Sequence, residues 1–119
     1  MNLITIKFPF KAISKDNEKV FNRQGRPFLS AKYKKFAELV RLIAVSQYKG
    51  KPLEGNLWVE MCFNFKNKVR CDLSNLPKGI LDACNGLLWK DDKQITGMQI
   101  SLTENAKEES FMLGVDKNE

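Results

Sequence analysis

The alternating side chains between Asn56 and Lys66 constrain the fold more than any other feature of the sequence. Every second residue in this segment is large and apolar: Leu57, Val59, Met61, Phe63 and Phe65. A period of two is that of an extended strand, whose successive side chains point to opposite faces of a sheet. Trp58 and Cys62 share the other face with polar residues, so we expect that face to be partly covered as well. The segment predicts a strand that is buried on one face and partly buried on the other.

Two amphipathic helices flank this strand in the sequence. Ser30 is the expected N-cap of the first helix, which ends near Gly50. Its buried stripe recurs at steps of three and four residues and consists of Tyr33, Phe36, Val40 and Ile43. The second helix is expected to begin after Ser74, with Pro77 in its first turn, where the missing N–H is harmless. Gly86 is its expected stop, and its expected stripe consists of Leu76, Ile80, Ala83 and Leu87.

Three more strands complete the predicted order β-α-β-α-β-β. They cover 3–8, 94–103 and 111–115, and Pro9 ends the first because it has no N–H for a sheet ladder. Within the second, the odd-numbered residues from Ile95 to Ser101 are expected on one face and the even-numbered residues on the other. This order mixes neighbouring strands with helical crossovers. It predicts an α+β fold in which two helices pack on a mixed sheet.

The residue counts restrict both the size of the fold and its chemistry. With 119 residues, 43% of them hydrophobic, 1–119 is the size of a single domain that can bury a core without disulfides. The three cysteines are odd in number and widely spaced, and no cationic leader or long apolar run is present. We therefore expect a cytoplasmic protein with no membrane span. The absence of histidine excludes Ser-His-Asp and Cys-His nucleophiles and leaves a shifted carboxylate, a lysine or a metal-activated water as general base.

The positive charge of the chain favours a polyanionic partner. Lys and Arg outnumber Asp and Glu by 20 to 14, which leaves +6 and a surface field that attracts nucleic acid. Basic residues concentrate in 66–70 and in 10–28, which lacks periodicity and is expected to be one long loop. The candidate DNA-binding residues are Lys11, Lys15, Arg23, Arg26, Lys66, Lys68 and Arg70. The same residues would also fit a surface whose charge serves only solubility.

Acidic residues and a lysine around the second helix form a candidate metal-dependent site. Asp72 stands just before the helix, Lys78 lies one turn into it, and Asp91 and Asp92 occupy the turn that follows. Mg²⁺ takes oxygen ligands, typically one or two carboxylates with water and substrate phosphates, and a lysine binds phosphate as a point charge. Structural roles fit the same residues: a charge at the helix start, an i, i+4 pair of Lys78 and Asp82, and an acidic turn. Spacing alone leaves both interpretations open.

The stretch from Cys71 to Ala83, followed by Leu88-Trp89-Lys90-Asp91-Asp92, resembles the signature of the RusA family of crossover junction endodeoxyribonucleases. That signature contains Asp-x-Asp-Asn-x-x-Lys, then Asp-Ala, and then a hydrophobic residue two positions before Asp-Asp. Gly25 to Ser30 and the helix after them are also similar to the family, so the resemblance spans nearly the whole chain. Ser74 is the exception, because the family usually has its second aspartate at this position.

The resemblance implies a RusA-like fold and an endonuclease dependent on Mg²⁺, or on Mn²⁺ in its place. It assigns Asp72, Lys78 and Asp92 to catalysis, and Asp72, Asp92, Asp91 and Ser74 to the metal, the last through a hydroxyl without charge. The implied substrate is the four-way (Holliday) junction of DNA recombination and repair. Because such a junction has approximate two-fold symmetry, paired nicks imply a C₂ homodimer. A bacterial or phage-encoded protein fits the resemblance.

Two other functions are compatible with the sequence. A branched-DNA-binding protein of the same fold that has lost catalysis is suggested by Ser74, which replaces a carboxylate. Junction binding without Mg²⁺-dependent cleavage would favour it. The other alternative is a basic structural or interaction protein with a resolvase-like fold, which the absence of salt-sensitive DNA binding would favour.

Overall fold

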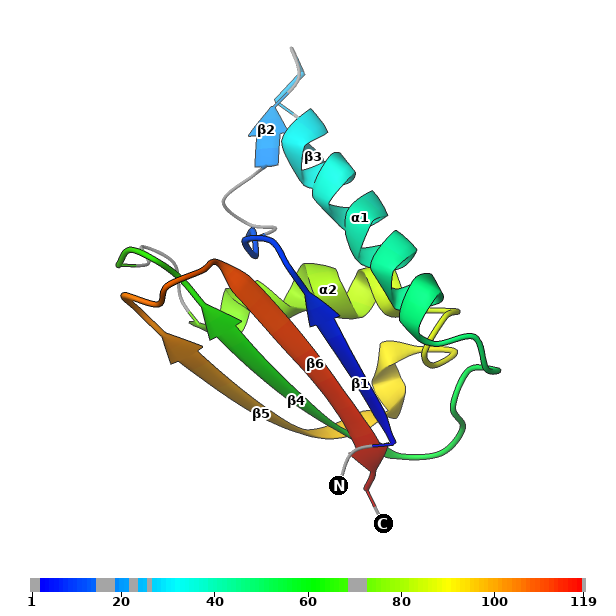
Figure 1. The fold of residues 1–119 in the computed structure, drawn as a ribbon. Helices are drawn as coiled ribbons and strands as arrows, with labels where there is room; N and C mark the ends of the chain where they lie inside the picture. The colour runs from blue at the N-terminus through cyan, green and yellow to red at the C-terminus, as the bar shows by residue number, and fades with distance from the viewer. Residues whose placement is uncertain (1–2, 15–18, 22–23, 26, 69–72, 119) are drawn as a thin grey trace.

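The predicted strand over 56–66 lies in the interior of a four-stranded sheet in the computed structural model (Figure 1). The structure describes residues 3–14, 19–21, 24–25, 27–68 and 73–118. The strand, β4 (Leu57–Asn64), pairs in parallel with β5 (Ile95–Thr103) and antiparallel with β6 (Ser110–Lys117). β1 (Ile4–Phe8) pairs antiparallel with β6, which makes the order β1-β6-β4-β5. The mixed sheet and its helices confirm the predicted α+β class.

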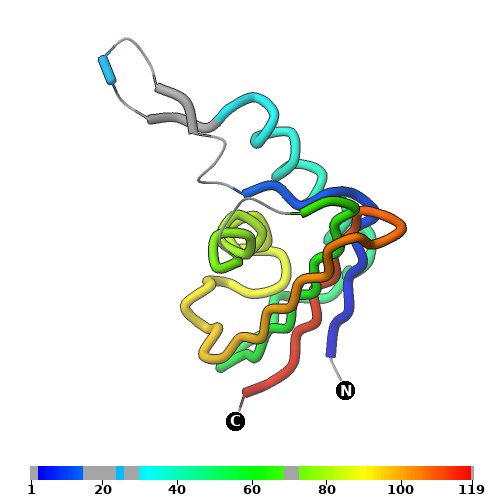
Figure 2. Tube along the Cα trace, turned by 90° about the vertical axis from the view of Figure 1, so that its left-hand side faces the viewer, coloured from blue at the N-terminus to red at the C-terminus, as the bar shows by residue number. Residues whose placement is uncertain are grey.

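Both helices cover the same face of this sheet (Figure 2). α1 (Ala31–Gln47) precedes β4, and α2 (Leu76–Cys84) connects β4 to its parallel neighbour β5. The alternation predicted for β4 is confirmed, because the side chains that face the helices are 0% exposed: Leu57, Val59, Met61 and Phe63. Trp58 on the opposite face is 37% exposed. No helix in the described ranges covers that face.

The predicted cap and apolar stripe of α1 are both present. The Ser30 side chain accepts a hydrogen bond from the Tyr33 backbone N–H at 3.1 Å, and the helix ends at Gln47, close to the expected Gly50. Tyr33 and Phe36 are buried and join an aromatic cluster with the stacked rings of Phe8 and Phe111, whose centroids are 4.4 Å apart. This cluster fastens α1 to the sheet.

α2 is shorter than predicted, and Ser74 does not cap it. The helix ends at Cys84, whose carbonyl accepts the N–H groups of Leu87 and Leu88 at 3.0 and 3.1 Å. Leu87 therefore lies outside the helix, in a turn where Gly86 has a φ of 82°, a conformation that favours glycine. Ser74 lies in a 3₁₀ turn, and Asn75 is the N-cap. After the helix the chain turns back, and Trp89 beyond the turn is 0% exposed.

The segment 10–28 is not the single irregular loop that was predicted, because it contains a short hairpin. β2 (Lys19–Phe21) pairs antiparallel with β3 (Pro27–Leu29). The hairpin lies beside the N-terminal end of α1, away from the main sheet (Figures 1 and 2). Strands of three residues are too short to show a hydrophobic period in the sequence.

A bulge in β5 changes the predicted faces of that strand. Leu57 is paired with Ile95, but the next residue of β4, Trp58, is paired with Gly97. Thr96 is the extra residue, so the side-chain alternation shifts by one position after Ile95. Ile95 therefore shares the helix-covered face with the even-numbered residues that follow, Met98, Ile100 and Leu102. The prediction that Ile95 and Gly97 are on the same face of the strand was wrong.

Candidate functional site

Lys78 and Asp82 lie on the exposed side of α2, one turn apart. A step of four residues returns to nearly the same side of a helix and advances about 6 Å along its axis. Ser74 precedes Lys78 by the same step and is exposed in the 3₁₀ turn before the helix. Within α2, Lys78 therefore lies on the same side as Asp82 and nearer the start of the helix.

Asp92 lies beside Asp91 in the turn before β5, and the negative charges of Asp82 and Asp91 both act on it. Burial raises the pKa of Asp92, and the hydrogen bond with Asp91 and the negative charge of Asp82 raise it further. The backbone N–H of Lys93 lowers the pKa of Asp91. The pKa of Asp92 therefore lies above that of Asp91.

Gln94 holds the acidic turn against the start of the sheet. Its Oε1 accepts the backbone N–H groups of Lys90 and Asp91 at 2.9 and 3.2 Å. Its Nε2 donates to the carbonyl oxygens of Leu53 and Gly55 at 2.9 and 3.0 Å. One side chain thus ties the turn before β5 to the loop before β4. Gln94 was absent from the predicted site, although the spacing Asp-x-x-Gln signals such a cap.

Asp91 and Asp92 have different structural surroundings. Asp91 caps the 3₁₀ turn Asp92–Gln94: its Oδ1 accepts the Lys93 backbone N–H at 2.8 Å. The structural role considered for Asp91 from the sequence is therefore present. Asp92 is the first residue within the turn and is half-buried, and the negative charge of Asp82 in α2 acts on it.

Contacts from α1 and the following turn fix the end of α2 that carries Asp82. Arg41 Nη1 of α1 donates to the Ala83 carbonyl oxygen at 2.8 Å, which satisfies one of the unpaired carbonyls of a helix end. The indole Nε1 of buried Trp89 donates to Asn85 Oδ1 at 2.8 Å. Both bonds adjoin the helix end and hold the chain around residues 83–89 in place.

The described donor atoms suit a hard divalent cation. Asp82 and Asp92 offer carboxylate oxygens, and Mg²⁺ needs only one or two carboxylates because it keeps several waters. No group of three or more acidic, histidine or cysteine side chains surrounds one point within the described ranges, and Asp72 lies outside them. Ser74 lies in the 3₁₀ turn before α2, outside the helix that carries Asp82. Of the four predicted metal ligands, the structure therefore describes Asp91, Asp92 and Ser74, but not Asp72.

The predicted DNA-binding lysines that the structure describes lie together at one end of the sheet. β1 and β4 both run antiparallel to β6 and therefore parallel to each other in direction. Their C-terminal ends lie at the same end of the sheet, where Lys11 follows β1 and Lys66 and Lys68 follow β4. All three are exposed, and Lys11 Nζ lies 3.9 Å from Glu109 Oε2. The other four predicted residues lie outside the described ranges: Lys15, Arg23, Arg26 and Arg70.

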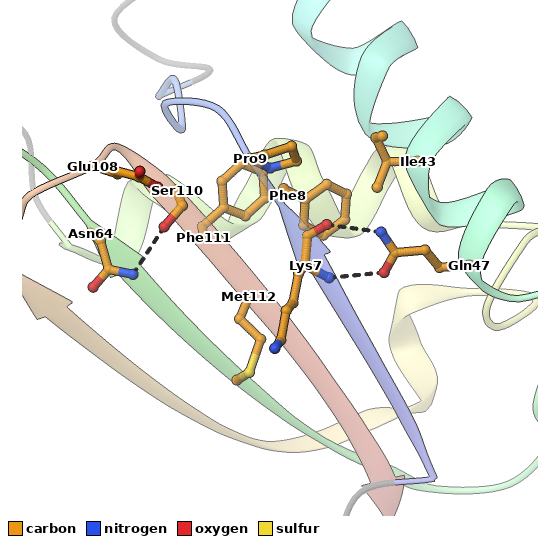
Figure 3. A pocket seen from close by; sticks show the side chains of 10 residues that line it. All are labelled: Lys7, Phe8, Pro9, Ile43, Gln47, Asn64, Glu108, Ser110, Phe111 and Met112. Carbon is orange, nitrogen blue, oxygen red and sulfur yellow. Dashed lines mark hydrogen bonds between the residues drawn. The ribbon is translucent and has the colours of Figure 1, made fainter.

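A cavity of about 440 Å³ lies between the end of α1 and the edge of the sheet formed by β1 and β6, away from the acidic turn (Figure 3). Gln47 crosses its wall: the side-chain amide accepts the Lys7 N–H and donates to the Lys7 carbonyl, both at 3.0 Å (Figure 3). This pairing occupies backbone groups on the open edge of β1 and blocks further strand addition there. None of the predicted site residues lines the cavity.

Comparison with known proteins identifies the family of this chain. No helix in the described ranges is long and apolar enough to cross a membrane. No curated protein sequence matches the chain. Residues 9–110 of the 119 match the family described as endodeoxyribonuclease RusA, a span that includes α2, Asp82 and the acidic turn. The chain therefore belongs to the RusA family of endodeoxyribonucleases, as the resemblance in its sequence indicated.

Proposed function

We propose that residues 1–119 form a single endonuclease domain that resolves four-way DNA junctions by paired, metal-dependent nicks in recombination and repair. The observation that carries this proposal is the family match, which spans both α2 with its exposed Lys78 and the turn that contains Asp92. A lysine and an acidic turn thus occur at the positions of the family signature. Phosphodiester hydrolysis needs both kinds of group.

The proposed roles follow from the chemistry of each side chain. Asp72 and Asp92 would hold Mg²⁺ or Mn²⁺, with Asp91 as a neighbour, and the ion would supply positive charge at the phosphate and activate water. The Lys78 ammonium would bind the phosphate or the leaving oxygen as a point charge. Ser74, which has no charge and lies one turn before Lys78, would act through its hydroxyl and a water.

The DNA contacts and the dimer belong to the same proposal. Lys11, Lys66 and Lys68 follow the ends of β1 and β4 at one end of the sheet, and their ammonium groups would bind the phosphates of DNA. The predicted residues beyond the described ranges, Lys15, Arg23, Arg26 and Arg70, would extend this surface. A C₂ homodimer would place two equal sites on a two-fold symmetric junction. Sedimentation at micromolar concentration tests the dimer, and a mass of one chain would contradict it.

Cleavage of a labelled four-way junction beside linear duplex, in Mg²⁺, Mn²⁺ or EDTA, tests the activity. We expect paired nicks on the junction in either metal, and none in EDTA or with Asp72→Asn or Lys78→Ala. Lys7→Ala is the matched control, because Lys7 is an exposed lysine of β1 on the opposite edge of the sheet from β5. Equal cleavage by wild type and Asp72→Asn would contradict the proposed mechanism.

The second candidate function is a junction-binding protein that has lost catalysis. Ser74 favours it, because the chain has no carboxylate at that position. Tight binding to the junction without nicks in either metal would establish this function. Wild-type cleavage that Asp72→Asn abolishes would eliminate it.

A further inference from the structure

The two edges of the main sheet differ in how they are protected against pairing with another strand. β1, at one edge, has five residues, and the Gln47 side chain binds the backbone N–H and carbonyl of its Lys7. β5, at the other edge, has nine residues, and within the described ranges it pairs with β4 alone (Figure 1). Of the four strands of this sheet, β5 is the one without a charged residue. Charges and proline usually protect an edge strand, and β5 has neither.

The outer edge of β5 is regular enough to accept another strand. After the bulge at Thr96, the residues from Gly97 to Thr103 pair without interruption with Trp58 to Asn64 of β4. In a parallel pair, about half of the backbone N–H and C=O groups point away from the partner strand. These groups of β5 are donors and acceptors for an added strand.

Exposed apolar side chains lie beside this edge. Met98 of β5 is exposed, as is Leu73 in the 3₁₀ turn that contacts β5. Trp58 is exposed on the uncovered face, and its ring lies against Gly97 of β5, where a Cβ would meet it. These side chains would add apolar area to the backbone pairing, and a stable interface buries about 1,200 Å² or more in total.

We propose that β5 pairs antiparallel with β5 of a second copy of this chain, so that the two four-stranded sheets become one. This inference rests on the dimer of the proposed function and names its interface. Each copy carries a net charge of +6, so most of its surface repels another copy. Two uncharged strands bring no like charges opposite each other, which makes β5 complementary to itself.

This pairing also places both copies of α2 where one junction can reach them. Two identical antiparallel strands are related by a two-fold axis perpendicular to the sheet. Because both helices of each copy cover the same face of its sheet (Figure 2), all four helices lie on one face of the joined sheet. The exposed Lys78 of each α2 is therefore on the face common to both copies. A dimer formed through the uncovered faces would place the two lysines on opposite sides.

Sedimentation velocity of the full chain over a range of concentrations tests the interface with charged variants. Gln99 and Ser101 are exposed on β5, and replacing both by lysine should raise the dissociation constant of the dimer at least about tenfold. Thr5→Lys is the matched control, because with Lys7 it places the same pair of lysines on exposed positions of β1, and its dimer should be as tight as that of wild type. Circular dichroism verifies that each variant is folded. A β5 variant that dimerises as tightly as wild type overturns the inference.

Hydrogen exchange followed by mass spectrometry tests the same interface without any substitution. The backbone amides of 95–103 should exchange more slowly at concentrations where wild type is a dimer than where it is a monomer. The amides of β1 should exchange equally at both concentrations. A dimer that leaves the exchange of β5 unchanged would show that the interface lies elsewhere.

Junction cleavage measured in parallel separates this inference from the proposed function. If wild type dimerises through β5 but cuts no junction, the interface stands and the nuclease does not. If wild type cuts junctions as a monomer, the nuclease stands and the interface is overturned. When both hold, the folded β5 variant should make single nicks in place of paired ones.

Discussion

Replacement of Gly79 by alanine tests how closely α1 and α2 approach. Gly79 lies in α2, next to Lys78, and a Cβ there would be 1.3 Å from Tyr33 Oη and 2.6 Å from Tyr33 Cζ. Tyr33 is 2% exposed, so its ring cannot turn into solvent. Two effects therefore oppose each other. In a helix interior, alanine is more favourable than glycine by about 1 kcal/mol. Overpacking a core, in contrast, costs about 1–3 kcal/mol or more.

The clash should be the larger effect, because the tyrosine oxygen must move by about 2 Å to reach ordinary contact distance, which places the cost at the upper end, about 3 kcal/mol. We expect Gly79→Ala to lower the free energy of unfolding by about 2 kcal/mol, which is about 8 °C in Tm for a chain of this size. Urea denaturation measures the loss. Junction cleavage should fall as well, because Lys78 shares the displaced turn.

A double-mutant cycle with Tyr33→Phe identifies the cause. Phenylalanine lacks the oxygen at 1.3 Å but keeps the ring carbon at 2.6 Å, so Gly79→Ala should cost less in that background and the coupling energy should be about 1 kcal/mol or more. A Gly79→Ala variant as stable as wild type, or equal losses in both backgrounds, would refute the close packing of the two helices.

Three further predictions concern the acidic turn and a buried thiol. Gln94→Ala removes four hydrogen bonds and should lower the free energy of unfolding, measured by urea denaturation, by about 2–3 kcal/mol. Gln99→Ala, at an exposed position on β5, should have little effect. Equal losses in the two variants would show that Gln94 does not hold the acidic turn. Because the pKa of Asp92 is raised above 3.8 in the folded protein, its protonated form contributes stability that is complete below 3.8 and is lost as the pH rises through the folded pKa. Asp92→Asn should therefore gain stability relative to wild type between pH 3 and pH 7, and a difference independent of pH would contradict the buried contact. Burial raises the pKa of Cys84 to about 12, so iodoacetamide at pH 8 should leave it unmodified in the native protein and alkylate it in urea, as peptide mass spectrometry would show; rapid native labelling would show that the α2 end is open.

The local periodicity of the sequence predicted the main elements, because a side chain's burial depends on the face to which its position points. The alternation from Leu57 to Phe65 correctly indicated the buried face of β4, and the cap at Ser30 correctly marked the start of α1. The signature from Asp72 to Asp92 indicated the family for a different reason, since reactive residue types at fixed spacings are visible without a fold. These features belong to short segments, and neighbours along the chain are sufficient to specify them.

Contacts between distant segments could be decided only by the tertiary structure. The bulge at Thr96 depends on how β5 pairs with β4, and nothing within β5 specifies it. The spacing of Asp91 and Gln94 predicts a local cap, but not the hydrogen bonds of Gln94 to Leu53 and Gly55, which are about forty residues away in the sequence. The sequence placed Asp82 in an ordinary helical charge pair, because its effect on the pKa of Asp92 depends on the turn before β5 lying near the end of α2. The sequence by itself determined which residues the site could use, and contacts between distant segments decided how those residues are placed.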